Sequence, residues 1–334
     1  MDVQWKEAIE EQTWVLGIDG GGTKTVFAAC DLRGTVLGLV ETGGTNPRRI
    51  TPRKSAAIIK EGVTALEEQV SLDRTQCASI YAGIAGFTFD QLARSCLTAA
   101  LAELGFACPI SVEGDLRCAW AGATGFAPGI VVGAGTGSFA YGEVPEGASV
   151  LVGGWGPHVG DDGSGFALGR DALKACCKAV DGTGPATVLV EMIIERLTLA
   201  SMRSLADTLQ GSQNATALIA SLTELVFQAF RQGDGVAEEI IKRGAAELVQ
   251  AAMAVRRRLF AGEHRVDVFP LGSVFTHQPS YVDLFQAKLR EVSPGDVVKK
   301  PLLQPYEGAL LLALRDVRAE HDWDTVLANL SHRA

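Results

Sequence analysis

One order of segments occurs twice in this chain of 334 residues. An apolar strand that runs into a glycine-rich turn is followed by two further strand-like segments, first from residue 13 and again from residue 129. Apolar runs separated by glycine turns predict strands and hairpins. Further strands and helices alternate after each of these units. Two copies of one α/β plan imply two lobes with a cleft between them.

The periodicity of the apolar residues assigns most of the chain to strands and helices. Breaks near Gly182, Gly184, Gly211 and Gly233 divide the mostly helical stretch at 163–262. The chain ends in a short amphipathic segment. The other expected strands are 13–21, 26–32, 35–41, 78–86, 109–115, 129–137, 138–144, 149–154 and 266–273, and the other expected helices are 50–70, 90–105, 116–125, 281–292 and 306–320.

Composition argues against several classes of protein. The net charge of −9 disfavours a nucleic-acid-binding face, which needs clustered Lys and Arg, and the basic run at 256–258 fits a solvated helix face. The polar start at 1–12 does not fit a secretory signal, and no apolar run reaches the roughly 20 residues of a membrane span. Seven cysteines without framework spacing favour reduced thiols. We therefore expect a cytoplasmic protein that binds neither nucleic acid nor membrane.

The two glycine-rich turns come close to nucleotide-binding motifs but match none of them. GIDGGGTKT at 17–25 departs from G-x-x-x-x-G-K-[ST], because Thr23 stands before Lys24 and a strand follows instead of a helix. GAGTGS at 133–138 departs from G-x-G-x-x-G at its last position, which is Ser138. What remains is a β-turn-β loop, rich in glycine and hydroxyl groups, that the chain uses twice.

A loop of this composition can bind phosphate. Glycine has no Cβ, so neighbouring backbone N–H groups can approach phosphate oxygens and converge on them. Threonine and serine hydroxyls add donors, and Lys24 adds a positive charge. Asp19 has the wrong charge for phosphate, but a carboxylate suits hydrated Mg²⁺. The alternative is a pair of tight hairpins whose glycines serve only the backbone geometry.

A third glycine-rich stretch, GGWGPHVGDDGSG at 153–165, combines six glycines with a Trp, a His and two adjacent acids. Glycine loses much conformational entropy when it is ordered, so six glycines in one loop need a reason. A binding site that uses backbone groups beside an aromatic ring and a carboxylate would be such a reason. The stretch runs directly into a helix-like segment. Favourable charge at the N-terminus of that helix is the ordinary explanation for Asp161 and Asp162.

Taken in order, GIDGGGTKT, TN, GD, GAGTGS and GGWG-x₃-GD-x-GS resemble the motifs of the N-acetylglucosamine kinases, which belong with the BadF/BadG/BcrA/BcrD ATPase family. The resemblance covers about residues 13–315, and 153–165 is its most specific part. It implies the two-lobed, actin-like ATPase fold (ribonuclease H-like) of the actin–Hsp70–sugar kinase superfamily. That fold is a duplicated mixed sheet with flanking helices. Dimers are common among such proteins, so we expect a homodimer.

The resemblance also implies a division of the chain. The N-terminal lobe would comprise 1–118 together with about 306–320, because 306–318 resembles the family's last helix, which returns to the first lobe. The C-terminal lobe, 119–305, would carry the second hairpin, the sugar loop and an adenosine loop. Residues 321–334 would form a C-terminal appendage.

The implied activity is ATP-dependent phosphorylation of an amino sugar, most directly N-acetyl-D-glucosamine at its 6-hydroxyl, with ATP and Mg²⁺. Asp115 matches the general base; an aspartate with an ordinary pKa of about 3.9 is ionised at neutral pH and can accept a proton. Asp19 would hold Mg²⁺ through water. The implied sugar-binding residues are Asn46, Gly154, Trp155, Gly156, Asp161 and Gly165, and the implied nucleotide-binding residues are Gly20, Gly21, Gly22, Thr23, Lys24, Gly135, Thr136, Gly137, Gly272 and Ser273.

Other readings of the same residues stay open. Asp115 could be the N-cap of the following helix, and PLGSV at 270–274 could be a plain strand-to-helix turn. The acceptor could be glucosamine, N-acetylmuramic acid or glucose. The chain could also be an ATPase activator of the same family with a shared iron–sulfur cluster, a sugar-sensing regulator, or an actin-like assembly protein.

Overall fold

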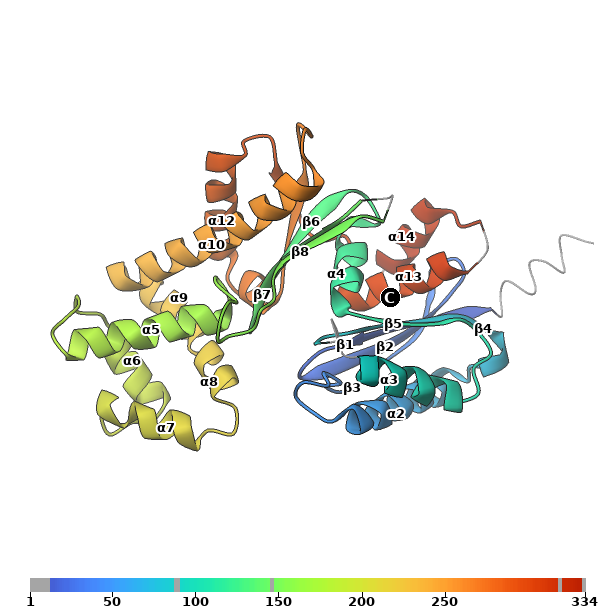
Figure 1. The fold of residues 1–334 in the computed structure, drawn as a ribbon, viewed down its shortest axis with the longest axis horizontal. Helices are drawn as coiled ribbons and strands as arrows, with labels where there is room; N and C mark the ends of the chain where they lie inside the picture. The colour runs from blue at the N-terminus through green and yellow to red at the C-terminus, as the bar shows by residue number, and fades with distance from the viewer. Residues whose placement is uncertain (1–12, 87–90, 145–146, 318–319, 332–334) are drawn as a thin grey trace, which may run out of the picture. The chain divides into compact units, whose positions relative to one another are not determined.

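The computed structural model describes residues 13–86, 91–144, 147–317 and 320–331. The chain forms two compact units, one made of residues 1–127 and 301–334 and the other of residues 128–300. Each unit is built on a five-stranded mixed sheet with flanking helices (Figure 1). None of the described helices is both long enough and apolar enough to span a bilayer.

The sheet of the first unit has the strand order β3-β2-β1-β4-β5. Its strands are β1 (Trp14–Gly20), β2 (Lys24–Asp31), β3 (Val36–Gly43), β4 (Cys77–Ile84) and β5 (Ile110–Glu113). Its helices are α2 (Pro52–Val70), α3 (Gln91–Glu103), α4 (Asp115–Thr124), α13 (Pro305–Asp316) and α14 (Trp323–Ser331), with a 3₁₀ turn at Arg74–Gln76.

The sheet of the second unit has the strand order β10-β9-β6-β7-β8. Its strands are β6 (Gly129–Ala134), β7 (Ser138–Glu143), β8 (Ser149–Gly153), β9 (Asp267–Leu271) and β10 (Val297–Val298). Its helices are α5 (Gly165–Val180), α6 (Leu189–Arg196), α7 (Leu205–Gly211), α8 (Ala215–Ser221), α9 (Thr223–Arg231), α10 (Gly235–Leu259), α11 (Ser273–His277) and α12 (Pro279–Val292), with a 3₁₀ turn at Met202–Ser204.

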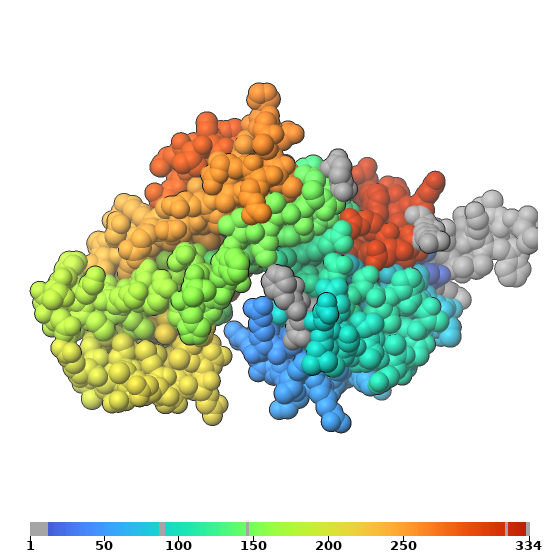
Figure 2. Space-filling view, viewed as in Figure 1, coloured from blue at the N-terminus to red at the C-terminus, as the bar shows by residue number. Residues whose placement is uncertain are grey.

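The two sheets repeat one topology, which confirms the predicted duplication. In the first sheet, β1 pairs antiparallel with β2 and parallel with β4. Strand β3 then pairs with β2, and β5 pairs with β4. In the second sheet, β6 pairs antiparallel with β7 and parallel with β9. Strand β8 then pairs with β7, and β10 pairs with β9. The copies differ in the crossover between their third and fourth strands. It contains α2 in the first copy and α5 to α10 in the second. The short helices α6 to α8 form a continuous yellow-green to yellow surface next to α5 (Figure 2).

The alternation of β1 decides which side chains face the first candidate site. Trp14, Leu16 and Ile18 belong to the core that the sheet forms with α2 and α3. Successive side chains of a strand point to opposite faces, so Gly17 and Asp19 face the other side, where α13 and α4 lie (Figure 1). A methyl group on Gly17 would lie only 2.7 Å from the backbone nitrogen of Leu310 in α13. Asp19 is therefore displayed on the face that α4 and α13 cover.

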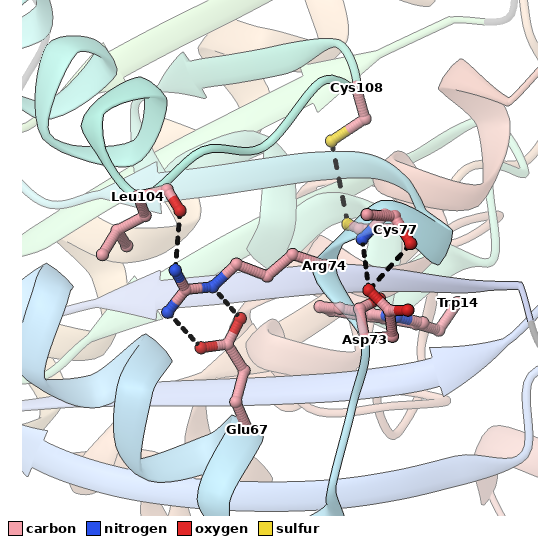
Figure 3. A network of polar contacts seen from close by, with 8 residues as sticks. Trp14, Glu67, Asp73, Arg74, Cys77, Leu104 and Cys108 are labelled. Carbon is pink, nitrogen blue, oxygen red and sulfur yellow. Dashed lines mark hydrogen bonds and ion pairs between the residues drawn. The ribbon is translucent and has the colours of Figure 1, made fainter.

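A polar network fixes the opposite, amino-terminal ends of β1 and β4 (Figure 3). The guanidinium of Arg74 donates to both carboxylate oxygens of Glu67 at 2.5 and 2.6 Å and to the carbonyl oxygen of Leu104 at 2.7 Å. The indole of Trp14 donates to the carbonyl oxygen of Asp73 at 2.9 Å. These bonds tie the ends of α2 and α3 to the sheet, which leaves the carboxyl-terminal ends of the strands to carry the candidate site.

The helices at the end of the chain complete the first unit. A methyl group on Gly308 in α13 would lie 2.0 Å from the carbonyl oxygen of Cys118, so α13 and α4 are in backbone contact. Because α4 is one continuous helix in this packing, the unit extends to residue 127, whereas the lobe boundaries expected from the sequence follow residues 118 and 305. Helix α14 packs on the same unit, where the amide of Asn329 donates to the carbonyl oxygen of Arg33 at 2.9 Å.

Candidate active site

Two aspartates of the first unit lie where parallel strands end. The register pairs Asp19 of β1 with Gly83 of β4, and Gly83 with Glu113 of β5. A methyl group on Gly83 would lie 2.3 Å from Sγ of Cys118 and 3.3 Å from Cα of Asp115, so the start of α4 rests directly on β4. The missing side chain at Gly83 thus lets Asp19 and Asp115 approach the same edge of the sheet, where α/β proteins place their ligands.

Asp115 is the first residue of α4, and the N-cap position belongs to Gly114. The alternative reading of Asp115 as the N-cap is therefore wrong. Although Asp115 is only half-buried as a residue, its carboxylate is desolvated, and this burial raises its pKa to about 6. A hydrogen bond from its own backbone N–H opposes the rise. A desolvated carboxylate with a pKa just below neutrality is ionised at pH 7 and more basic than a solvated aspartate.

Asp19 is perturbed further than Asp115. Burial raises its pKa to about 7, and the negative charge of Asp115 adds to the rise, while the positive charge of Lys24 opposes it. A cation bound at these two desolvated carboxylates would relieve their repulsion. Across the described ranges, no three His, Cys, Asp or Glu side chains are placed to hold a metal together. A carboxylate such as that of Asp19 is the type of ligand that hydrated Mg²⁺ takes.

The first hairpin, between β1 and β2, is braced by the segment that follows β3. The N–H of Gly21 donates to the carbonyl of Lys24 at 2.8 Å, and the carbonyl of Gly21 accepts from the N–H groups of Thr45 and Asn46 at 3.0 and 3.2 Å. A methyl group on Gly44 would lie 2.6 Å from the carbonyl of Gly22. The hairpin and the segment are thus in backbone contact, which a side chain at position 44 would prevent.

Two residues predicted for this half-site have structural partners. The ammonium of Lys24 pairs with the carboxylate of Glu41 on β3 at 2.8 Å, in an exposed position. Oδ1 of Asn46 accepts the backbone N–H of Arg48 at 2.9 Å, and a methyl group on Gly86 would lie 2.4 Å from it. The structure thus brings Asp19, Asp115, Asn46 and the hairpin Gly20–Lys24 into one unit, with Lys24 held in an ion pair.

In the second unit, the hairpin between β6 and β7 meets the first turn of α5. The N–H groups of Gly165 and Phe166 donate to the carbonyls of Gly135 and Thr136 at 2.8 and 3.2 Å. The hairpin lines a cavity of about 630 Å³ in the same unit. Its lining residues are Gly135, Thr136, Gly165, Ala217, Ala220, Ser221, Thr223, Glu224, Ser273, Val274, His277 and Gln278. Gly165, expected at the sugar, therefore lies with the predicted nucleotide residues.

Gly272 has a structural reason to be glycine. Its φ is +95°, and a methyl group would lie 2.6 Å from the carbonyl oxygen of Ala134 at the end of β6. It is the N-cap of the short helix α11. The strand-to-helix turn predicted as the plain alternative is therefore present, and it places Ser273 on the cavity beside the hairpin.

Asp161 joins the loop 153–165 to the second hairpin. Its side chain is buried, at 8% exposure, and Oδ1 accepts the N–H of Gly156 at 3.3 Å. A methyl group on Gly137 would lie 2.7 Å from Oδ2, so the carboxylate rests on the hairpin. Burial raises the pKa of Asp161, and hydrogen bonds from the Ser138 and Gly156 backbones oppose the rise. Helix α5 is capped by Ser164 instead, so Asp161 is not a helix cap.

The backbone of this loop is tightly curved. Gly153, Gly154, Gly156 and Gly163 have positive φ, and so does Asp161 at 62°. Trp155 is 74% exposed, and it lines a groove of about 750 Å³ together with Asp161 and Asp162. Helix α10 supplies the other wall. The predicted indole and buried carboxylate therefore share one groove of the second unit.

Several residues that line these sites were not predicted. Thr223, Glu224, His277 and Gln278 line the cavity beside the second hairpin. They lie in or next to helices α9, α11 and α12, whose packing no local motif in the sequence signals. Arg49 lies against the first hairpin, where a methyl group on Gly22 would be 3.0 Å from its Nε. The only signal for Arg49 was its place three residues after Asn46 in the segment TNPRR.

Comparisons with known proteins agree with this architecture. The family model of the BadF/BadG/BcrA/BcrD ATPase family matches residues 16–313. A Clostridium acetobutylicum protein named N-acetylmuramic acid/N-acetylglucosamine kinase is 33% identical, over 82% of this chain and 89% of its own. A Dictyostelium discoideum protein named N-acetyl-D-glucosamine kinase is 30% identical, over 90% of this chain and 97% of its own.

Solved structures support the fold. A Chromobacterium violaceum protein provisionally named N-acetylglucosamine kinase has a TM-score of 0.71 at 24% identity, with 90% of this chain and 99% of its own covered. The matched family region includes both glycine hairpins, Asp115 and the loop 153–165. The two actin-like sheets and the length of the match lead to one assignment. The chain belongs to the BadF/BadG/BcrA/BcrD ATPase family.

Proposed function

We propose that this protein is an ATP-dependent amino-sugar kinase that phosphorylates N-acetyl-D-glucosamine at its 6-hydroxyl. The observation that carries the proposal is the desolvated Asp115, which begins α4 next to Asp19 and has a pKa of about 6. Phosphoryl transfer needs a positioned base and charge stabilisation rather than a protein nucleophile. The curated relatives, at 33 and 30% identity, are named as kinases of N-acetylated amino sugars.

In this proposal Asp115 is the general base. Its ionised carboxylate accepts the proton of the sugar 6-hydroxyl as the hydroxyl oxygen forms a bond to the terminal phosphorus of ATP. The bond from that phosphorus to the bridging oxygen breaks, and ADP leaves with the electron pair. The desolvated surroundings of Asp115 favour proton uptake, because burial disfavours its charged form.

The two glycine hairpins would hold the nucleotide. Gly20, Gly21, Gly22, Thr23 and Lys24 in the first unit, and Gly135, Thr136 and Gly137 in the second, would donate to the phosphates. The cavity of about 630 Å³ beside the second hairpin, with Gly272 and Ser273 at its edge, would take the adenosine side. We place Gly165 with this group, since its N–H is bonded to Gly135.

Asp161, Trp155, Asn46 and the backbone of Gly154 and Gly156 would bind the sugar. A carboxylate has about four acceptor sites, so Asp161 can hold Gly156 and still accept from ring hydroxyls. The exposed indole of Trp155 would provide an apolar wall. Asn46 keeps its amide hydrogens as donors while its oxygen holds the turn to Arg48.

Asp19 would hold Mg²⁺ through water, with Asp115 as its charged neighbour. Bound Mg²⁺ would neutralise charge on the phosphates of the nucleotide. The proposal also includes a homodimer in the cytoplasm, and sedimentation of the purified protein would test the dimer.

N-acetylmuramic acid is the second candidate acceptor, because the Clostridium relative is named for both sugars. A coupled ADP-release assay with N-acetylglucosamine, N-acetylmuramic acid, glucosamine and glucose tests the proposal. We expect kcat/KM to be higher with N-acetylglucosamine and N-acetylmuramic acid than with glucosamine or glucose, since a site built to hydrogen-bond an acetamide rejects sugars that lack it. A purified, folded protein that phosphorylates none of the four sugars would contradict the kinase assignment.

The raised pKa of Asp115 predicts an acid limb in the activity. The base must be ionised, so kcat/KM for the sugar should fall about tenfold per pH unit below pH 6 and level off above it. The profile is measured at saturating MgATP. The D161N variant serves as control, because it keeps Asp115 and should keep the midpoint. Activity that stays constant down to pH 5 would mean that Asp115 is not the limiting base.

A further inference from the structure

We propose that Arg49 contacts the terminal phosphate of ATP and supplies the positive charge of the first hairpin. The proposal rests on the phosphoryl-transfer function proposed above and adds a residue from outside the glycine-rich motifs. Arg49 lies at the end of the segment 44–49, which follows β3 and packs on the hairpin between β1 and β2.

The guanidinium of Arg49 lies beside Gly22 of the hairpin, and backbone hydrogen bonds hold the segment that carries it. A methyl group on Gly22 would lie 3.0 Å from Nε and 3.1 Å from Cζ of Arg49. The segment is fixed there because the N–H groups of Thr45 and Asn46 donate to the carbonyl of Gly21. The N–H of Arg49 in turn donates to the carbonyl of Asn46 at 3.0 Å, which closes the turn. A ligand at the Gly22 backbone would therefore meet the Arg49 side chain.

The charges around the hairpin favour Arg49 over Lys24 as the phosphate ligand. Lys24 is paired with Glu41 at 2.8 Å, so the charge of Glu41 offsets part of its own. The ion pairs formed within the described ranges do not include Arg49, and its side chain is exposed. A planar guanidinium can donate two parallel hydrogen bonds to one phosphate, which an ammonium cannot.

The position of Arg49 in the first unit indicates which phosphate of ATP it contacts. The same unit carries Asp115, the proposed base. Phosphoryl transfer requires the transferred phosphoryl group to lie beside the base, so a cation of this unit is expected to contact that group. Negative charge rearranges on that group in the transition state, where a guanidinium beside it is most stabilising.

The test compares R49Q with R48Q, which removes the same charge one residue away. Both side chains are exposed, so both variants should unfold at the wild-type temperature. We expect R49Q to lower kcat/KM for ATP by at least about tenfold, as for loss of a transition-state donor, while R48Q stays within about twofold. R49K should recover part of the loss, because it restores the charge without the bidentate geometry.

A second measurement separates Arg49 from the identity of the sugar. Titration calorimetry with ATP and with AMP, in the absence of sugar, should show weaker ATP binding in R49Q and unchanged AMP binding. This arm needs no acceptor, so it reports on Arg49 even if the kinase assay fails for every sugar tried. Equal losses in R49Q and R48Q, or ATP binding and turnover in R49Q within about twofold of wild type, would overturn the proposal.

Discussion

Replacement of Asp115 by Asn should lower kcat by about 1,000-fold and leave the dissociation constants of ATP and sugar within about threefold of wild type. General-base catalysis contributes about 10²- to 10⁴-fold, and an amide of the same shape cannot take the hydroxyl proton. The backbone of Asp115, bonded into α4, is unaffected by the change. Steady-state kinetics and calorimetry on the same preparation measure the two effects separately.

Glu113 is the matched control for Asp115. It lies two residues earlier at the end of β5, and its carboxylate accepts the hydroxyl of Tyr81 at 2.7 Å, which a glutamine oxygen can also do. E113Q should therefore keep kcat within about threefold. D115N should also be no less heat-stable than wild type at pH 7. Burial raises the pKa of Asp115 in the folded protein. Ionisation of Asp115 therefore lowers the free energy of unfolding as pH rises from about 4 through 6. Near-normal turnover by D115N would remove Asp115 from the mechanism.

Replacement of Asp161 by Asn should lower kcat/KM for the sugar by about 100-fold. A hydrogen bond to a charged group contributes about 1.5–3 kcal/mol, and the neutral amide loses that strength toward ring hydroxyls. Asn is the informative substitution because Asp161 has a φ of 62°, a conformation that Asn tolerates and most residues do not. Its amide oxygen can still accept the N–H of Gly156, so the loop should keep its shape.

Asp162 provides the comparison for Asp161. It is adjacent, carries the same charge and is exposed, with its carboxylate 4.0 Å from the guanidinium of Arg170. D162N should change kcat/KM less than about twofold, because an exposed ion pair contributes little. Sugar kinetics at saturating ATP measure both variants. Equal losses in D161N and D162N would indicate a general effect of charge, and wild-type kinetics in D161N would exclude the residue from sugar binding.

Local patterns in the sequence were sufficient to predict most strands of the two sheets and the glycine-rich turns of the candidate site. Apolar runs that end in glycine turns identified β1 and β6, and the repeated order identified the duplication. The apolar period located α2 to within two residues and the start of α13 to within one, although the helix expected over 306–320 ends at Asp316. The two-residue strand β10 and the five-residue helix α11 were missed, because such short elements exist only through packing on β9 and α12.

The pairing and burial of the site residues could not be predicted. That the charge of Asp115 raises the pKa of Asp19 depends on the register of β1 with β4 and on the absence of a side chain at Gly83. The ion pair between Lys24 and Glu41 depends on the pairing of β2 with β3. The exposure of Trp155 and the burial of Asp161 arise from left-handed backbone at several positions, which glycine content suggests but does not locate.

The position of the transferred phosphate tests the central claim most directly. The wild-type protein is incubated with MgATP and N-acetyl-D-glucosamine, and the sugar product is examined by phosphorus–proton correlation NMR. The account predicts one product with the phosphate on the C6 oxygen, formed in equal amount with ADP, and formed about 1,000-fold more slowly by D115N. Phosphate on any other oxygen of the sugar, or ADP released without a phosphorylated sugar, would contradict it.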